Sequence, residues 1–167
     1  MTKDIYLLGS TGSIGETTLN ILKKDKKKFK VKLLTTNSNV NKLYKQAIQF
    51  KVKNVVIFNK EKYLKNIKQF KLKNINVFSS IDEAFKTKKK KSYITINAIS
   101  GIDGLEPSLN IIKHSDNLAI ANKESIICGW NFLKKELFKN NTKFIPLDSE
   151  HFSIWSLLKN EKIQTIN

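Results

Sequence analysis

The chain has 167 residues, and its 31 cationic residues are all lysine; with 14 acids the formal net charge is +17. Hydrophobic residues make up 40% of the chain, which excludes wholesale disorder and suits one domain with little to spare. No apolar run is long enough to cross a membrane, and the single cysteine, Cys128, excludes an internal disulfide framework. A single cysteine suits a reducing compartment, and the start of the chain carries no signal-like apolar region.

The excess of lysine raises the possibility of a nucleic-acid partner, and the rest of the composition argues against it. Lysine, asparagine and isoleucine are abundant while arginine is absent, which is what codon usage in an A+T-rich genome produces. Lysine runs such as 86–91 have no interleaved aromatic residues, and specific readout of bases relies on the planar arginine fork. We therefore expect a solvated basic surface, with no nucleic-acid and no membrane partner.

Short apolar runs alternate with helical patterns along the chain. Strands are expected at 5–8, 31–34, 55–57, 75–78, 93–96, 118–120 and 144–145. Helices are expected at about 13–22, 40–50, 60–70, 81–85, 105–112, 126–137 and 153–158, with Ser80 as a candidate cap of the helix at 81–85. In the first helix Ser13 is the expected N-cap, and the expected buried face consists of Ile14, Thr18, Ile21 and Leu22. Cys128 is expected to be a buried thiol. The alternation predicts an α/β fold, a doubly wound, mostly parallel sheet with helices on both faces.

The first expected strand runs into a glycine-rich turn, Gly9-Ser10-Thr11-Gly12-Ser13-Ile14-Gly15. Its first gap is one residue longer than in the standard dinucleotide fingerprint. Glycines let the backbone turn sharply and approach a pyrophosphate, and the following helix points free N–H groups at it. The pattern predicts a Rossmann-like nucleotide site; a tight turn with no ligand is the alternative.

The end of the second expected strand indicates which dinucleotide binds. NAD sites place Asp or Glu there to accept from the ribose 2′-OH. Here residues 33–39 carry no acid, and Lys42 lies just beyond them. Neutral donors near a lysine favour the 2′-phosphate of NADPH; a polar loop facing water is the alternative.

Two further segments, 119–125 and 145–151, place charged residues directly after expected strands. Asp148 and Glu150 are two residues apart, so in an extended backbone they face the same way and can share one hard cation. Alternatively, Asp148 or Ser149 caps a helix, and Lys123 and Glu124 form an exposed ion pair.

The residues at 9–15, 121–125 and 146–151, in this order and spacing, resemble the 1-deoxy-D-xylulose 5-phosphate reductoisomerase family, as does the glycine-containing segment 98–107. Members of that family are more than twice this length, so the chain resembles their N-terminal portion. The resemblance implies an NADPH-binding domain over 1–146 and the truncated beginning of a catalytic, metal-binding domain over 147–167.

The resemblance also implies a function. The family rearranges 1-deoxy-D-xylulose 5-phosphate and reduces the product with NADPH to 2-C-methyl-D-erythritol 4-phosphate, on the non-mevalonate route to isoprenoids. It uses a divalent Mg, Mn or Co ion. A full-length homodimer in the bacterial cytoplasm is implied too. The family's third carboxylate ligand and substrate-phosphate residues lie beyond residue 167, so we expect the chain alone to be inactive.

Site residues follow from the same motifs. Cofactor contacts are implied for Gly9, Thr11, Gly12, Ser13, Ile14, Asn37, Ser38, Asn39, Asn122 and Glu124. Substrate contacts are implied for Lys123, Ser149 and Glu150, metal ligation for Asp148 and Glu150, and catalytic roles for Lys123, Asp148 and Glu150. Family members often carry glycine or a basic residue where this chain has Asn37 and Ser38. The alternatives are another NAD(P)-dependent dehydrogenase, such as a homoserine or aspartate-semialdehyde dehydrogenase, and a non-enzymatic basic binding module.

Overall fold

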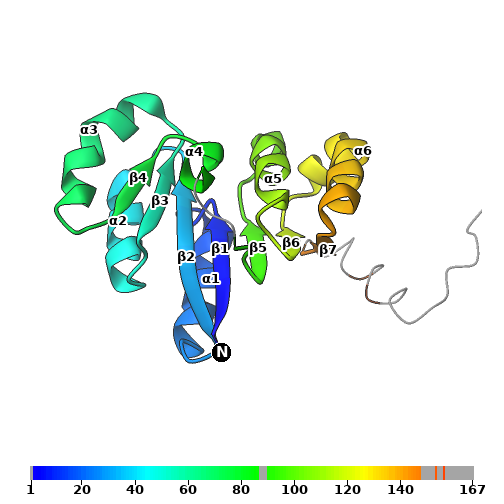
Figure 1. Ribbon diagram of the computed structural model, residues 1–167, viewed down its shortest axis with the longest axis horizontal. Coiled ribbons are helices and arrows are strands. Elements are labelled where there is room, and N and C mark those ends of the chain that lie inside the picture. The colour runs from blue at the N-terminus through cyan, green and yellow to red at the C-terminus, as the bar shows by residue number, and fades with distance from the viewer. Residues whose placement is uncertain (1, 87–89, 148–152, 154–155, 157–167) are drawn as a thin grey trace, which may run out of the picture.

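Seven strands form one sheet in the order β4-β3-β2-β1-β5-β6-β7, and every neighbouring pair is parallel (Figure 1). The computed structural model describes residues 2–86, 90–147, 153 and 156. The strands are β1 (Lys3–Leu8), β2 (Phe29–Thr36), β3 (Asn54–Ile57), β4 (Asn76–Phe78), β5 (Ile94–Asn97), β6 (Asn117–Ile120) and β7 (Lys143–Pro146). The helices are α1 (Ser13–Lys24), α2 (Val40–Gln49), α3 (Lys60–Lys71), α4 (Ile81–Phe85), α5 (Leu105–Ile112) and α6 (Lys123–Asn140), with a 3-10 turn at Ile102–Gly104.

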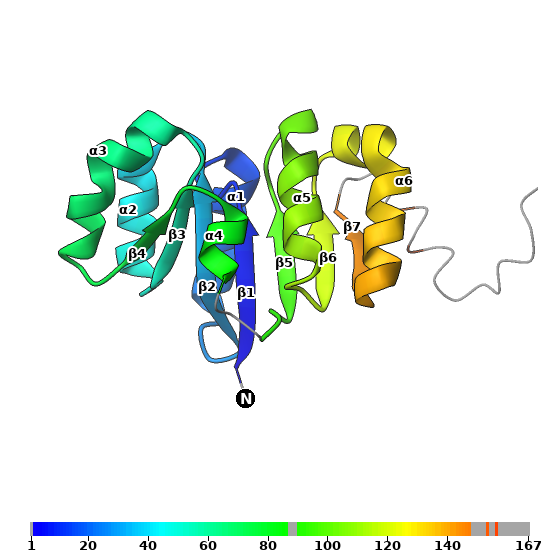
Figure 2. The same ribbon diagram turned by 45° about the horizontal axis from the view of Figure 1, so that its top comes forward.

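The sheet buries an apolar cluster on each of its faces, because successive side chains of a strand point to opposite sides. In β1, Ile5 and Leu7 belong to the cluster that packs against α1 and α2, while Tyr6 and Leu8 belong to the cluster under α4, α5 and α6. Figure 2 shows these two sets of helices on opposite sides of the sheet. The predicted doubly wound α/β fold is confirmed.

The predicted start of α1 is wrong by one residue, and the predicted buried face is confirmed only at Leu22. Gly12 is the N-cap and Ser13 is the first helical residue. The buried residues are Gly15, Leu19 and Leu22, whereas Ile14 and Ile21 are 47% and 63% exposed. The face turns toward Gly15 because a residue without a side chain lets the helix lie directly on the preceding loop. A search for regularly spaced apolar side chains does not count glycine, so it cannot locate a buried helix face that is centred on Gly15.

The predicted burial of Cys128 is also wrong, since its thiol is exposed. Helix α6 faces inward with Ile126, Gly129 and Leu133. A Cβ added to Gly129 would stand 2.7 Å from Cδ2 of Leu105, so α6 and α5 pack closely at this glycine. Cys128 precedes Gly129 on the helix and therefore points away from the contact.

The expected helix at 153–158 and the residues after it lie mostly outside the described residues, so the division at 146/147 stays a prediction. None of the helices in the described part of the chain combines the length and the hydropathy needed to cross a bilayer.

Candidate functional site

The strand order reverses between β1 and β5, so the loops that leave these two strands run to opposite sides of the sheet. In open parallel sheets this is where ligands bind, at the carboxyl ends of the strands. Gly9 follows β1 at this point with a φ of 72°. A Cβ on Gly9 would lie 2.9 Å from the carbonyl carbon of Ala98, which follows β5. Both the backbone conformation and the close approach therefore require glycine.

The glycine-rich loop (residues 9–15) is held by the end of β2. The Gly9 amide donates to Oγ1 of Thr35 at 2.9 Å, and the Ser10 amide donates to the Thr35 carbonyl at 2.9 Å. The hydroxyls of Thr11 and Thr36 share a hydrogen bond of 2.7 Å. Thr35 and Thr36 thus bind the loop, a role that the sequence analysis missed because it considered the end of β2 only for its lack of an acid.

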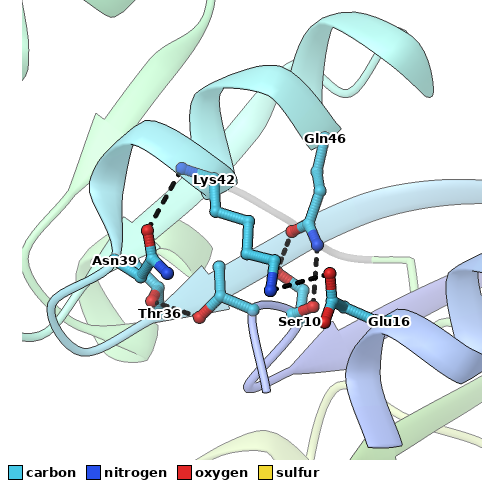
Figure 3. Close-up of polar contacts among 7 residues, drawn as sticks. Ser10, Glu16, Thr36, Asn39, Lys42 and Gln46 are labelled. Atoms are coloured by element: carbon cyan, nitrogen blue, oxygen red, sulfur yellow. Dashed lines mark hydrogen bonds and ion pairs between the residues drawn. The ribbon is translucent and has the colours of Figure 1, made fainter. Parts of the chain in front are cut away.

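Helix α2 also binds the loop, through a side chain that the sequence analysis did not single out. Oγ of Ser10 donates to Oε1 of Gln46 at 2.8 Å, and Nε2 of Gln46 donates to the Ser10 carbonyl at 2.9 Å (Figure 3). Both residues are buried. The available signal was a glutamine between Leu43 and Ala47, on the apolar face of a predicted helix.

The first turn of α1 has no side-chain cap, because its N-cap is Gly12. The first intrahelical bond runs from the Glu16 amide to the Gly12 carbonyl at 2.9 Å, so the amides at 13–15 precede it. Four other helices are capped by side chains, those of Asn39, Asn59, Ser80 and Asn122. A Cβ on Gly12 would have its nearest neighbour, the Gly9 carbonyl oxygen, at 3.6 Å. This uncapped, open helix start fits the pyrophosphate of a dinucleotide.

The loop after β2 carries the neutral residues Asn37, Ser38 and Asn39. Oδ1 of Asn39 accepts from the Lys42 amide at 3.3 Å, so Asn39 caps α2. The Lys42 ammonium lies 2.7 Å from the Glu16 carboxylate of α1 (Figure 3). Nζ of Lys62, from α3, donates to the Ser38 carbonyl at 3.1 Å. No local sequence pattern points to Lys62, because it lies 24 positions from Ser38 in the chain.

The motif after β6 lies at the same edge of the sheet. Oδ1 of Asn122 accepts from the Ser125 amide at 2.9 Å and caps α6, and Nδ2 of Asn122 donates to the Ile99 carbonyl at 2.7 Å. Lys123 and Glu124 form the exposed first turn of α6. Asn122 therefore joins the loops that follow β5 and β6.

A second asparagine completes this junction. Nδ2 of Asn97, at the end of β5, donates to the Gly104 carbonyl at 2.8 Å and to Oγ of Ser108 at 2.6 Å, and its Oδ1 accepts from the Ile99 amide at 3.0 Å. A Cβ on Gly104 would lie 2.6 Å from Nδ2 of Asn122. The segment that resembles the family's glycine-containing loop is thus packed against the Asn122 motif.

The third motif is described only at its start. The Leu147 amide donates to the Ile120 carbonyl at 2.8 Å, which holds the residue before Asp148 beside the end of β6. The candidate residues Asp148, Ser149 and Glu150 lie outside the described residues. Among the residues that are described, no group of three or more His, Cys, Asp or Glu side chains is arranged to hold a metal ion.

A cavity of about 790 Å³ lies at the opposite edge of the sheet, where β1, β2 and β3 begin. Its lining includes Asp4, Lys30 and Lys53 and no residue of the glycine-rich loop. Lysine is abundant throughout the chain, so the lysines around this cavity do not mark a ligand site. We assign the cavity no role in cofactor binding.

Comparison with known proteins identifies close relatives of this chain. The family model for 1-deoxy-D-xylulose 5-phosphate reductoisomerase matches residues 5–129. A reductoisomerase of this name from Pelagibacter ubique is 53% identical over 163 residues, with 96% of this chain and 42% of that protein covered. One from Clostridium acetobutylicum is 34% identical over 168 residues, with 99% of this chain and 44% of that protein covered. The chain spans about two fifths of the length of the curated relatives it matches.

Solved structures give the same answer. The reductoisomerase from Zymomonas mobilis in complex with NADPH superposes with a TM-score of 0.80 and 28% identity, with 90% of this chain and 40% of that chain covered. A complex of the enzyme with NADPH, fosmidomycin and magnesium has a TM-score of 0.81 and 26% identity, covering 92% of this chain and 38% of that one. An archaeal homoserine dehydrogenase, at 16% identity and a TM-score of 0.56, shares the fold alone. The chain belongs to the 1-deoxy-D-xylulose 5-phosphate reductoisomerase family.

Proposed function

We propose that this chain binds NADPH and forms the cofactor-binding part of an enzyme that converts 1-deoxy-D-xylulose 5-phosphate to 2-C-methyl-D-erythritol 4-phosphate. The observation that carries the proposal is the uncapped start of α1 behind a glycine loop held by β2 and α2. The reductoisomerase from Zymomonas mobilis was solved with NADPH, which supports the choice of cofactor. Bound NADPH supplies the hydride for the reduction.

The pyrophosphate contacts are assigned to the glycine-rich loop. Gly9 and Gly12 let the backbone come close to the phosphates, while the amides of Thr11, Ser13 and Ile14 present N–H groups and the positive end of α1 to them. The open space at Gly12 lets the ligand approach the backbone. The loop at Asn37, Ser38 and Asn39 follows β2 and takes the 2′-phosphate end of the cofactor.

The residues after β6 are assigned to the other end of the cofactor. Because β6 lies beyond the switch between β1 and β5, Asn122 and Glu124 stand on the side opposite to the 2′-phosphate loop. One N–H and one oxygen lone pair of the Asn122 amide hold the loops after β5 and β6 together, and the second N–H and lone pair are assigned to the cofactor. Lys123, exposed at the start of α6, is assigned to the substrate.

The metal and the remaining substrate contacts are assigned to the third motif. Asp148 and Glu150 offer the oxygen ligands that Mg or Mn prefers, with Co as a further candidate, and Ser149 is assigned to the substrate. The support is the Asp-x-Glu spacing, together with the position of Leu147 beside the end of β6. Family membership supports a homodimer of the full-length protein and a location in the bacterial cytoplasm.

Titration calorimetry of the 167-residue chain with NADPH and with NADH tests the cofactor assignment. We expect NADPH to bind more tightly, because no acid at the end of β2 accepts from a ribose 2′-OH. Equal affinities for the two cofactors, or tighter binding of NADH, would contradict the assignment of NADPH.

Turnover of a full-length protein that includes this chain tests the metal assignment. Asp148→Asn and Glu150→Gln should each nearly eliminate turnover while NADPH affinity stays close to normal, because the glycine-rich loop binds the cofactor independently of the carboxylates. Partial rescue by a higher metal concentration is expected. Full activity of either variant would show that the pair holds no metal.

A further inference from the structure

The loop assigned to the 2′-phosphate provides no cation of its own. Asn37, Ser38 and Asn39 are neutral, and the nearby Lys42 ammonium is 2.7 Å from the Glu16 carboxylate. A lysine and a glutamate in contact have no net charge. A cationic donor binds a phosphate more strongly than a neutral donor does, so a clear preference for NADPH favours a cation supplied from outside this loop.

Lys62 is the lysine that the fold brings to this loop. Its Nζ donates to the Ser38 carbonyl at 3.1 Å, although the two residues are 24 positions apart in the chain. The approach results from the parallel pairing of β2 with β3, in which Thr36 lies opposite Ile57. The loops that follow two neighbouring parallel strands leave the sheet at the same edge, side by side.

The backbone of α3 is fixed at this place by the same loop. The Asn59 amide donates to the Asn37 carbonyl at 3.2 Å, and Oδ1 of Asn59 accepts from the Lys62 amide at 3.0 Å. Asn59 thus caps α3 and binds the end of the β2 loop. The position of Lys62 relative to Ser38 is therefore set by backbone contacts, while its side chain stays exposed.

The Lys62 ammonium keeps its charge available for a ligand. Within the described part of the chain, no carboxylate oxygen lies within 4.0 Å of its Nζ. The adjacent Glu61 does not face it, because neighbouring residues on a helix point in different directions. Its present partner is a carbonyl, and an ammonium has two further protons to donate.

We propose that Lys62 binds the 2′-phosphate of NADPH and sets the preference of this chain for NADPH over NADH. The inference rests on the proposed function, and it names the residue that supplies the cation which the loop after β2 lacks. The lysine acts from the neighbouring helix, with Ser38 providing the carbonyl that holds its ammonium near the ligand.

The experiment measures dissociation constants of the 167-residue chain for NADPH and NADH by calorimetry, with Lys62→Gln as the test variant. We expect Lys62→Gln to weaken NADPH binding about tenfold, equivalent to about 1.4 kcal/mol, and to change NADH binding by less than about twofold. Adenosine 2′,5′-bisphosphate should lose affinity in parallel with NADPH, whereas adenosine 5′-monophosphate should not. Lys62→Arg should retain most of the preference because it keeps the charge.

Lys65→Gln is the matched control, since it removes the same charge from an exposed position on the same helix. It should leave both affinities within about twofold of the wild type. If Lys62→Gln retains the wild-type preference, or weakens both cofactors equally, the assignment of Lys62 is wrong while the proposed function stands. If the wild-type chain binds neither cofactor, the proposed function fails and the inference fails with it.

Discussion

Ser10 and Gln46 are joined by two hydrogen bonds of 2.8 and 2.9 Å, which use the hydroxyl and the carbonyl of the serine and both ends of the glutamine amide. Ser10 is completely buried in the glycine-rich loop, and Gln46 is 7% exposed on α2. The pair therefore fixes the glycine-rich loop, which is assigned to the pyrophosphate, relative to α2.

Gln46→Leu should lower the free energy of unfolding by about 1–3 kcal/mol, because it leaves the buried Ser10 carbonyl without its amide donor. Urea denaturation measures the change. Gln49→Leu, at an exposed position on the same helix, is the control and should stay within about 0.5 kcal/mol. Equal effects of the two substitutions would show that the hydrogen bonds of Gln46 contribute nothing specific.

Gly12 and Gly15 should respond differently to alanine. A Cβ on Gly15 would lie 2.6 Å from Cα of Ser10, so Gly15→Ala should destabilise the fold, by about 1–3 kcal/mol. A Cβ on Gly12 meets nothing closer than 3.6 Å, so Gly12→Ala should leave the melting temperature almost unchanged.

Because Gly12 has open space around it, Gly12→Val tests NADPH binding and not the stability of the fold. It should abolish NADPH binding because its side chain occupies the space through which the pyrophosphate approaches the backbone. Circular dichroism checks that the variant is folded, and calorimetry measures binding. Normal affinity in the folded variant would mean that the loop is only a tight turn.

Ser80 and Glu83 form a capping arrangement at α4, and it should make stability depend on pH. The Ser79 amide donates to Oε2 of Glu83 at 2.7 Å, and this bond is the main reason that the pKa of the Glu83 carboxyl lies below its usual range. A lowered folded-state pKa stabilises the fold fully above the ordinary pKa, about 4.3, and the contribution is lost as the pH falls through the folded value.

Glu83→Gln should therefore destabilise the protein at pH 7 by less than about 1 kcal/mol, because solvent screens this partly exposed charge, and progressively less below about pH 4. Urea denaturation at pH 7, 5 and 3 tests this. Glu61→Gln, in the first turn of α3, is a control that should show little effect. A destabilisation by Glu83→Gln that is the same at every pH would contradict the role of the charge.

Cys128 should react with a thiol reagent in the native state, because it is exposed on α6. Since it is the only cysteine in the chain, labelling with Ellman's reagent in the absence of denaturant should reach one equivalent. Cys128→Ala should change the free energy of unfolding by less than about 0.5 kcal/mol. A thiol that reacts only after addition of urea would show that Cys128 is buried in solution.

Local patterns in the sequence were sufficient to predict the order of the elements, the parallel sheet and the glycine-rich turn. The reason is that each depends on neighbouring residues: a short apolar run forms a buried strand, and glycine after a strand permits the turn at Gly9. The predicted cap at Ser80 is confirmed for the same reason, since its partner is three residues away. The buried faces of α1 and α6 were harder to predict from the sequence. Gly15 and Gly129 determine these faces because a residue without a side chain lets the helix pack closely at that point.

The sequence by itself determined that this chain is a doubly wound α/β domain of the reductoisomerase family, with a glycine-rich loop after its first strand. Only the tertiary structure decided what surrounds that loop. Thr35, Gln46 and Lys62 are separated from their partners by 24 to 36 positions and meet them because parallel strands leave the sheet at one common edge. Contacts of that kind depend on strand order and helix packing, which no local pattern of residues contains.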